Sequence, residues 1–125
     1  MTKKVLNYNT KTKKVSSLGS IKVFGGRNFM NCKELTECII PETVTDMSGY
    51  GIFQNADLYK AIIPKNVTSL GFMVFGGNKN LKYIIFEPTT PPTLNGNLSI
   101  SNAECLIYVP DESLEAYKTA TNWSN

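Results

Sequence analysis

The chain repeats itself with a fixed period of 23 residues, and this self-similarity limits its fold more than any other feature. When the sequence is shifted by one period, leucines superimpose on leucines and apolar positions on apolar positions, with no insertion anywhere in the comparison. A unit this short cannot bury its apolar residues alone, so the period predicts a stack of similar units around one continuous core. The aligned positions are Leu35/Leu58/Leu81, Cys38/Ala61/Ile84, Ile40/Ile63/Phe86, Pro41/Pro64, Ile21/Val44/Val67, Phe24/Met47/Leu70, Phe29/Ile52/Phe75 and Cys32/Asn55/Asn78.

Each unit carries the spacing L-x-x-a-x-a, where "a" is apolar, which predicts a short strand. The last two positions are two residues apart and therefore share one face of an extended chain. Pro41 and Pro64 then end the strand, because proline has no backbone donor. A second extended piece, rich in β-branched residues, follows at 44–47 and 67–70. The predicted strands, adjacent, parallel and in register, are residues 35–40, 58–63 and 81–86.

The units resemble the BspA-type subclass of leucine-rich repeats, whose pattern is F-x-x-C-x-x-L-x-x-I-x-I-P-x-x-V-T-x-I-G. Residues 29–47 read FMNCKELTECIIPETVTDM, and the C-terminal stretch, with Thr90-Pro91-Pro92 and Trp123, is similar to what often closes such arrays. The resemblance covers about residues 20–123. It implies a mainly β fold, a short leucine-rich-repeat solenoid of about three 23-residue repeats with parallel strands.

Both ends of the chain carry patterns that predict caps on this stack, because an open terminal repeat would expose core and unpaired backbone. Residues 5–11 alternate apolar and polar side chains, which predicts a strand or hairpin. Residues 105–109 read as a last strand, followed by a helix with Asp111 as its N-cap that reaches about Asn122. Its apolar face would carry Leu114, Tyr117, Ala120 and Trp123. We therefore predict one domain over residues 1–125, with an N-terminal cap (1–19), repeats (20–87) and a C-terminal cap of strand plus helix (88–125).

The chain contains no histidine, which removes Ser-His-Asp and Cys-His catalysis and histidine metal sites together. The glycine pairs 25–26 and 76–77 belong to no phosphate-binding motif and read as turns. The acidic residues Asp111, Glu112 and Glu115 fit the first turn of the predicted helix, whose dipole favours negative charge there. We expect no enzyme activity, no catalytic residue, no metal site and no cofactor.

Three cysteines, Cys32, Cys38 and Cys105, form an odd set whose spacing matches no zinc or redox motif. Free, small, buried thiols are the expected state. Cys38 in particular is predicted to be buried and reduced, because its equivalents in the other units are Ala61 and Ile84.

Eight of the thirteen basic residues precede the first acid, Glu34, although the net charge is only +3. A basic arm can attract phosphates, yet this one has no recognition helix and few stacking rings, so nucleic acid is an unlikely partner. No apolar run is long enough to insert into a membrane, and no signal peptide is recognisable. The localisation stays open: the resemblance implies a cell surface, and a virion or the cytoplasm are the alternatives.

The outward positions of the predicted strands form two rows on the concave face of the sheet. An apolar row beside a mixed row is the composition of a contact site, and the competing explanation is that β-branched residues simply form good strands or lie under a cap. The candidate binding residues are Glu37, Lys60 and Tyr83 in one row and Ile39, Ile62 and Ile85 in the next.

Two functions are compatible with these observations. The first is a non-enzymatic binding module that recognises a protein or a glycan, or mediates adhesion, through the concave sheet, as the resemblance implies. The alternative is a structural or receptor-binding subunit of a larger assembly such as a phage tail or virion, with possible homo-oligomers.

Overall fold

A computed structural model describes residues 6–9, 14–17, 26 and 29–123, with the backbone alone for 6–9, 14–17 and 38–39. The described part of the chain is mainly β, with short strands and little helix. In chain order the elements are β1 (Leu6–Asn9), β2 (Lys14–Ser17), β3 (Glu37–Ile39), β4 (Asp46–Met47), β5 (Lys60–Ile63), β6 (Ser69–Leu70), β7 (Tyr83–Phe86), β8 (Thr93–Leu94), β9 (Leu106–Tyr108), the 3₁₀ turn η1 (Asp111–Ser113) and helix α1 (Leu114–Thr119).

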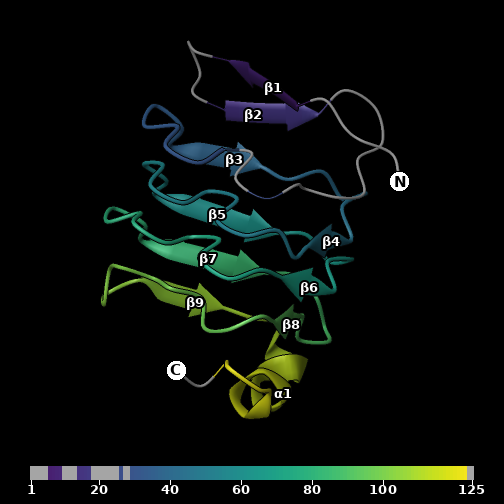
Figure 1. Ribbon diagram of the computed structural model, residues 1–125. Coiled ribbons are helices and arrows are strands. Elements are labelled where there is room, and N and C mark those ends of the chain that lie inside the picture. The colour runs from purple at the N-terminus through teal and green to yellow at the C-terminus, as the bar shows by residue number, and fades with distance from the viewer. Residues whose placement is uncertain (1–5, 10–13, 18–25, 27–28, 124–125) are drawn as a thin grey trace.

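The strands form two sheets that run side by side along the stack (Figure 1). The larger sheet has the order β1-β2-β3-β5-β7-β9, in which only β1 runs antiparallel to its neighbour, and the smaller has the order β4-β6-β8 and is parallel. Glu37 pairs with Lys60, and Lys60 with Tyr83, which confirms the predicted parallel, in-register strands. Each of the three strands begins two residues later than predicted, and β3 also ends one residue earlier, at Ile39.

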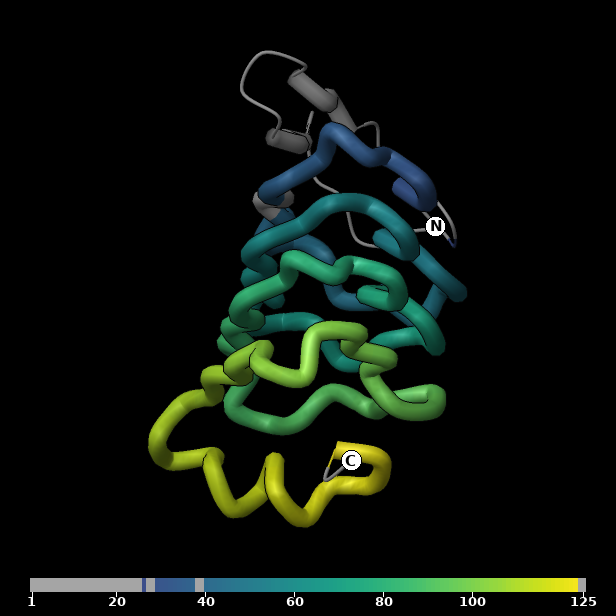
Figure 2. Tube along the Cα trace, turned by 90° about the vertical axis from the view of Figure 1, so that its left-hand side faces the viewer, coloured from purple at the N-terminus to yellow at the C-terminus, as the bar shows by residue number. Residues whose placement is uncertain are grey.

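The same spacing of 23 residues continues beyond the stretch 20–87 to which the sequence analysis assigned the repeats. Lys14 of β2 pairs with Glu37, and Leu106 of β9 pairs with Tyr83. The larger sheet therefore contains five strands in one register, with β1 added at one edge as the outer strand of a hairpin. Figure 2 shows the successive turns of the chain lying one above another.

Columns of equivalent apolar side chains run through the core. Leu35, Leu58 and Leu81 are fully buried, as predicted from their alignment. Complete burial of such a side chain stabilises the fold by roughly 1.5–3 kcal/mol. Further core columns are formed by Ala61/Ile84, Ile40/Ile63/Phe86, Val44/Val67 and Met47/Leu70/Leu94.

The aromatic column in the loops differs from the sequence alignment. Phe29 stacks on Phe53 and Phe53 on Phe75, with ring centroids 5.3 and 6.2 Å apart and planes within 10° and 7° of parallel. The alignment had placed Ile52 between the two phenylalanines. The second unit has one additional residue before its ring and one fewer after it, so Ile52 is buried beside the column while Phe53 occupies it.

This compensated shift also corrects the predicted equivalence of Asn55 and Asn78. The N–H groups of Cys32, Ala56 and Asn78 each donate to the carbonyl of the ring residue three positions earlier. These three positions are therefore structurally equivalent. Asn55 instead corresponds to Asn31 and Gly77, and all three have left-handed backbone φ angles of 57°, 62° and 74°. An ungapped comparison cannot detect two length changes that cancel within one unit.

The C-terminal helix is shorter than predicted and begins differently. It starts as the 3₁₀ turn η1, so Asp111 is the first residue of this turn rather than the N-cap, and Pro110 takes the cap position without a side-chain acceptor. Helix α1 ends at Thr119 because Ala120 is extended. The predicted apolar face is also only partly buried: Tyr117 is buried, whereas 44% of Leu114 is exposed.

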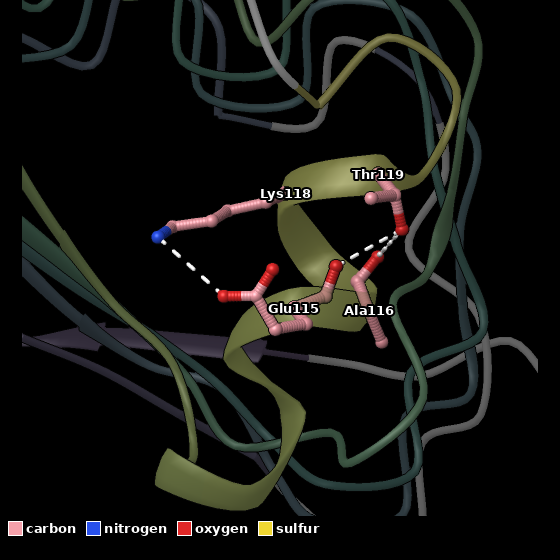
Figure 3. A network of polar contacts seen from close by, with 4 residues as sticks. All are labelled: Glu115, Ala116, Lys118 and Thr119. Carbon is pink, nitrogen blue, oxygen red and sulfur yellow. Dashed lines mark hydrogen bonds and ion pairs between the residues drawn. The ribbon is translucent and has the colours of Figure 1, made fainter.

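Figure 3 shows the polar contacts near the end of α1. The Thr119 hydroxyl donates to the carbonyls of Glu115 (2.9 Å) and Ala116 (3.4 Å), and Lys118 Nζ lies 3.7 Å from Glu115 Oε1. Exposed pairs of this kind contribute little to stability. The helix is held instead by aromatic packing: the rings of Tyr117 and Trp123 lie 6.1 and 4.7 Å from that of Phe86.

Candidate functional site

The residues of the larger sheet that alternate with the core positions form what we call the outer face: Glu37, Lys60, Tyr83 and Leu106 in one row and Ile39, Ile62, Ile85 and Tyr108 in the next. In β5 and β7 the side chains alternate between half-buried and buried along the strand. Because the strands are in register, residues on one row are direct neighbours across the sheet. The outer face therefore presents a continuous surface formed by several units.

An apolar depression, the aromatic hollow, lies at the β7–β9 end of the outer face. It has a volume of about 450 Å³ and is lined by Tyr83, Ile85 and Tyr108. The two tyrosine rings meet edge to face, with centroids 6.4 Å apart and an angle of 85°. Lys60 Nζ lies 6.0 Å from the Tyr83 ring centroid, within the range of a cation–π contact. The hollow thus has aromatic walls and a cation at its border.

A second depression, the acidic hollow, lies beside it over β3 and β5. It has a volume of about 180 Å³, and its charged lining residues are three carboxylates and one ammonium group: Glu37, Glu42, Glu87 and Lys60. The Tyr59 hydroxyl donates a 3.2 Å hydrogen bond to Glu37 Oε2. This bond and the nearby negative charge raise the pKa of Tyr59, since they disfavour a phenolate.

Five of the six candidate residues have described side chains on this face: Glu37, Lys60, Ile62, Tyr83 and Ile85 are all half-buried. Ile39 pairs with Ile62 through its backbone, and its side chain lies outside the described part of the structure. The outer isoleucines Ile62 and Ile85 are more exposed than Ile40 and Ile63 of the core, which is the expected order. Their role in binding stays a prediction.

Four residues of this surface were not predicted from the sequence: Leu106, Tyr108, Glu42 and Glu87. The signal for two of them was present in the sequence, since Leu106 and Tyr108 follow Tyr83 and Ile85 by the repeat period. The two glutamates each follow the last core position of a unit, where a sequence pattern alone does not distinguish a surface turn from the border of a hollow.

The reactive groups of the described residues offer little covalent chemistry. Cys32 and Cys105 are free, and burial raises the pKa of the Cys105 thiol, so it stays protonated near neutral pH and is a poor nucleophile. The side chain of Cys38, predicted to be buried, lies outside what the structure describes. Among the described residues no group of three or more cysteine, aspartate or glutamate side chains is placed to hold a metal ion.

No helix in the described ranges has the length and apolar character required to cross a membrane. The outer face presents aromatic rings, aliphatic side chains and carboxylates.

Stacked parallel strands in one register, with a buried leucine before each of the central strands β3, β5 and β7, define a leucine-rich repeat protein. More specifically, the chain belongs to the BspA type leucine-rich repeat family, whose model, with six copies of the repeat, matches residues 2–107. The match extends from before β1 into β9, in agreement with the strand spacing. No curated protein matches the sequence. Proteins of this class are generally non-enzymatic, and their repeats generally mediate protein interactions.

Proposed function

We propose that this protein is a non-enzymatic recognition module that binds a protein ligand on the outer face of its larger sheet. The aromatic hollow is the observation that carries the proposal. Three apolar or aromatic side chains, Tyr83, Ile85 and Tyr108, line a depression of about 450 Å³ on this face. Aromatic side chains in desolvated pockets commonly dominate the free energy of protein association.

The surroundings of the hollow favour a protein over a glycan. Its lining is apolar, whereas recognition of a sugar also requires several convergent polar groups. The adjacent acidic hollow, with its three carboxylates, complements a lysine or arginine on the ligand. The expected ligand segment carries one large apolar side chain and a nearby basic one. A role in adhesion would follow if the ligand belongs to another cell or to a matrix.

The test is a comparative capture experiment with the immobilised protein. The bait variant is Tyr83→Ala/Tyr108→Ala, and its matched control is Tyr50→Ala/Phe72→Ala, which removes a second exposed aromatic pair with rings 6.1 Å apart away from the outer face. We expect one ligand protein to be captured by the wild type and by the control variant but not by Tyr83→Ala/Tyr108→Ala. After purification, this ligand should bind the wild-type protein directly.

Two results would contradict the proposal. Loss of the captured protein in the Tyr50/Phe72 variant alone would move the site to the loops. Binding to a glycan array that depends on Tyr83 and Tyr108, without any protein ligand, would identify the outer face as a carbohydrate site.

A subunit of a larger assembly is the second candidate function. The observation in its favour is the edge strand β9, all of whose residues are exposed.

A further inference from the structure

The last strand of the larger sheet ends the stack with an open apolar edge. Leu106, Ile107 and Tyr108 of β9 are 58%, 42% and 52% exposed, whereas Ile84 and Ala61, which occupy the same row as Ile107 in β7 and β5, are buried. Helix α1 lies below β8 of the smaller sheet and leaves β9 uncovered (Figure 1). Within the described part of the chain, the place that the next unit would occupy against β9 is therefore open.

The backbone at this edge has hydrogen-bonding capacity directed away from the molecule. The N–H of Leu106 donates to the carbonyl of Lys82 at 2.9 Å, so the backbone polar groups of Leu106 point toward β7. Neighbouring residues of a strand alternate in direction, and the N–H and C=O of Ile107 therefore point toward the free edge. Exposed edge strands readily pair with a strand from another chain.

The opposite edge of the same sheet is β1, and the two ends of the chain carry opposite charge. Residues 1–33, which include β1 and β2, contain eight lysines and arginines and no acid. The segment that follows β7 contains one lysine, Lys118, and its acids within and after the last unit are exposed: Glu104, Asp111, Glu112 and Glu115. The C-terminal segment that contains β9 is therefore acidic, and the N-terminal segment that contains β1 is basic in its composition.

We propose that copies of this protein associate head to tail, with β9 of one copy pairing with β1 of the next. In such a stack successive copies keep one orientation, and the pair would be antiparallel because β1 runs opposite to the other strands of the sheet. The contact joins a strand of the acidic C-terminal segment to a strand of the basic N-terminal segment. A two-fold arrangement that pairs β9 with β9 would instead bring Glu104 and Glu112 of two copies together.

A head-to-tail contact uses two different surfaces, so it leaves one of each free and generates open chains or closed rings rather than a fixed dimer. The head-to-tail contact leaves the outer face accessible to a ligand, because pairing at the sheet edges extends that face instead of covering it. Self-association and ligand capture can therefore fail separately.

The first test measures mass by sedimentation velocity over a series of protein concentrations in low and high salt. We expect species larger than a dimer that grow with concentration and dissociate as salt screens the charges. Ile107→Pro should abolish association, since it removes the outward N–H without removing a hydrogen bond to β7, and proline is tolerated at sheet edges. Ile107→Val, which keeps the N–H, should associate as wild type does. A wild-type protein that is monomeric at every concentration overturns the proposal.

The second test uses charge reversal at the acidic end and does not depend on how β9 tolerates proline. Glu104→Lys/Glu112→Lys should be monomeric alone, yet its N-terminal end still accepts the acidic end of wild type. Added in small amounts to wild type, it should shorten the assemblies as a chain terminator. The control variant Glu42→Lys/Asp57→Lys reverses the same number of acids within the stack and should not shorten the assemblies. If the reversed variant instead forms dimers with wild type more tightly than wild type does with itself, β9 pairs with β9 and the proposal is wrong.

Discussion

Asn78 is a buried polar residue that joins two turns of the stack through its side chain. Its Oδ1 accepts a hydrogen bond from the N–H of Leu58 (3.0 Å), and its Nδ2 donates to the carbonyls of Phe53 and Phe75 (both 2.9 Å). The residue is fully buried, so the N–H of Leu58 takes its partner from the amide and not from water. The carbonyls of Phe53 and Phe75 each accept a second hydrogen bond from it, in addition to those from the N–H groups of Ala56 and Asn78. The equivalent residue one unit earlier, Ala56, makes no such connection through its side chain because it has no polar atom.

We predict that Asn78→Ala lowers the free energy of unfolding by about 2–4 kcal/mol, since it takes the hydrogen-bond acceptor from the buried N–H of Leu58 and removes the amide's bonds to the carbonyls of Phe53 and Phe75. Urea denaturation measures this loss, and an m-value equal to that of the wild type shows that unfolding stays two-state. Asn80→Ala is the matched control, because Asn80 is exposed and its amide bonds only to Asp57 at 3.0 Å. Its effect should stay within about 0.5 kcal/mol. Equal effects of the two changes would show that the buried amide has no special importance.

Individual residues were predictable from the sequence where they repeat in phase. The leucine column followed directly from the alignment of Leu35, Leu58 and Leu81. The role of Asn78 did not, because the ungapped alignment equated it with Asn55, which lies in a left-handed turn. Only the stacking of Phe53 between its neighbours reveals the correct correspondence.

At the scale of a single element, β5 shows how the two faces of a strand differ. Ile62 is half-buried on the outer face, and Ile63 is completely buried. Ile63→Asp should unfold the protein, because an unpaired charge in the core costs several kcal/mol and total stability is only about 5–15 kcal/mol. Ile62→Asp should remain folded by circular dichroism and proton NMR and should weaken ligand capture. If both variants unfold to the same extent, the assignment of the outer face is wrong.

Helix α1 is fixed to the last turn of the stack by Tyr117, whose hydroxyl donates a 2.6 Å hydrogen bond to the carbonyl of Pro88. Burial raises the pKa of Tyr117 from 10.0 to about 12. A phenol with a raised pKa in the folded state stabilises the fold fully below its unfolded pKa, and this contribution is lost as the pH rises through the folded value.

Tyr117→Phe should therefore lower stability by about 1 kcal/mol at neutral pH through the lost hydrogen bond. It should also remove part of the decrease in stability that wild type shows between pH 10 and 12. Denaturation curves at several alkaline pH values measure both effects, with Tyr50→Phe as the control, since Tyr50 is exposed. A variant as sensitive to alkali as wild type would show that Tyr117 is not the titrating group.

The elements were predicted from the sequence with uneven success for physical reasons. Strands β3, β5 and β7 recur with the period, and β5 and β7 alternate in burial, so their pattern is strong. The helix was predicted too long, because its apolar spacing continues to Trp123 while the chain turns extended at Ala120. Trp123 still reaches the core, where its Nε1 donates to the carbonyl of Pro92 at 2.9 Å, from a turn rather than from a helix.

The whole molecule is an array in which units contact their nearest neighbours, so removal of one complete unit should leave a foldable protein. Deletion of residues 41–63 joins Ile40 to Pro64, as Ile63 joins Pro64 in the wild type. It also brings together the first and third units, in which the ring precedes the leucine by the same number of residues, so Phe29 can stack on Phe75. We expect cooperative unfolding with a smaller m-value and a lower stability, because less surface is buried.

The control for this deletion is removal of residues 41–62, which leaves one additional residue between the strand and Pro64. That residue moves every later position out of phase with the preceding strand. We expect this variant to be much less stable or unfolded in the same denaturation experiment. If the two deletions are equally stable, the 23-residue phase does not determine the fold.

The architecture of the whole molecule was the most predictable level, since a fixed period permits few folds. The number of strands in the larger sheet was less predictable, because β2 and β9 keep the register without the leucine pattern of the central units. The hollows of the outer face arise from contacts between units and borders of loops, which no single strand pattern encodes.

The position of the Phe53 ring, one residue later in its unit than in the other two, indicates which length changes the gene can accumulate during evolution. One residue gained before Phe53 and one lost after it leave Leu58 in phase with the other leucines. Codons can therefore be gained and lost in these loops provided that the total between successive strands is conserved. Unequal recombination between any two equivalent codons would add or remove a whole turn, whereas a single-codon insertion within a strand would turn its following side chains to the opposite face. The loops are therefore the segments in which such a gene can gain or lose codons without changing the register of the strands.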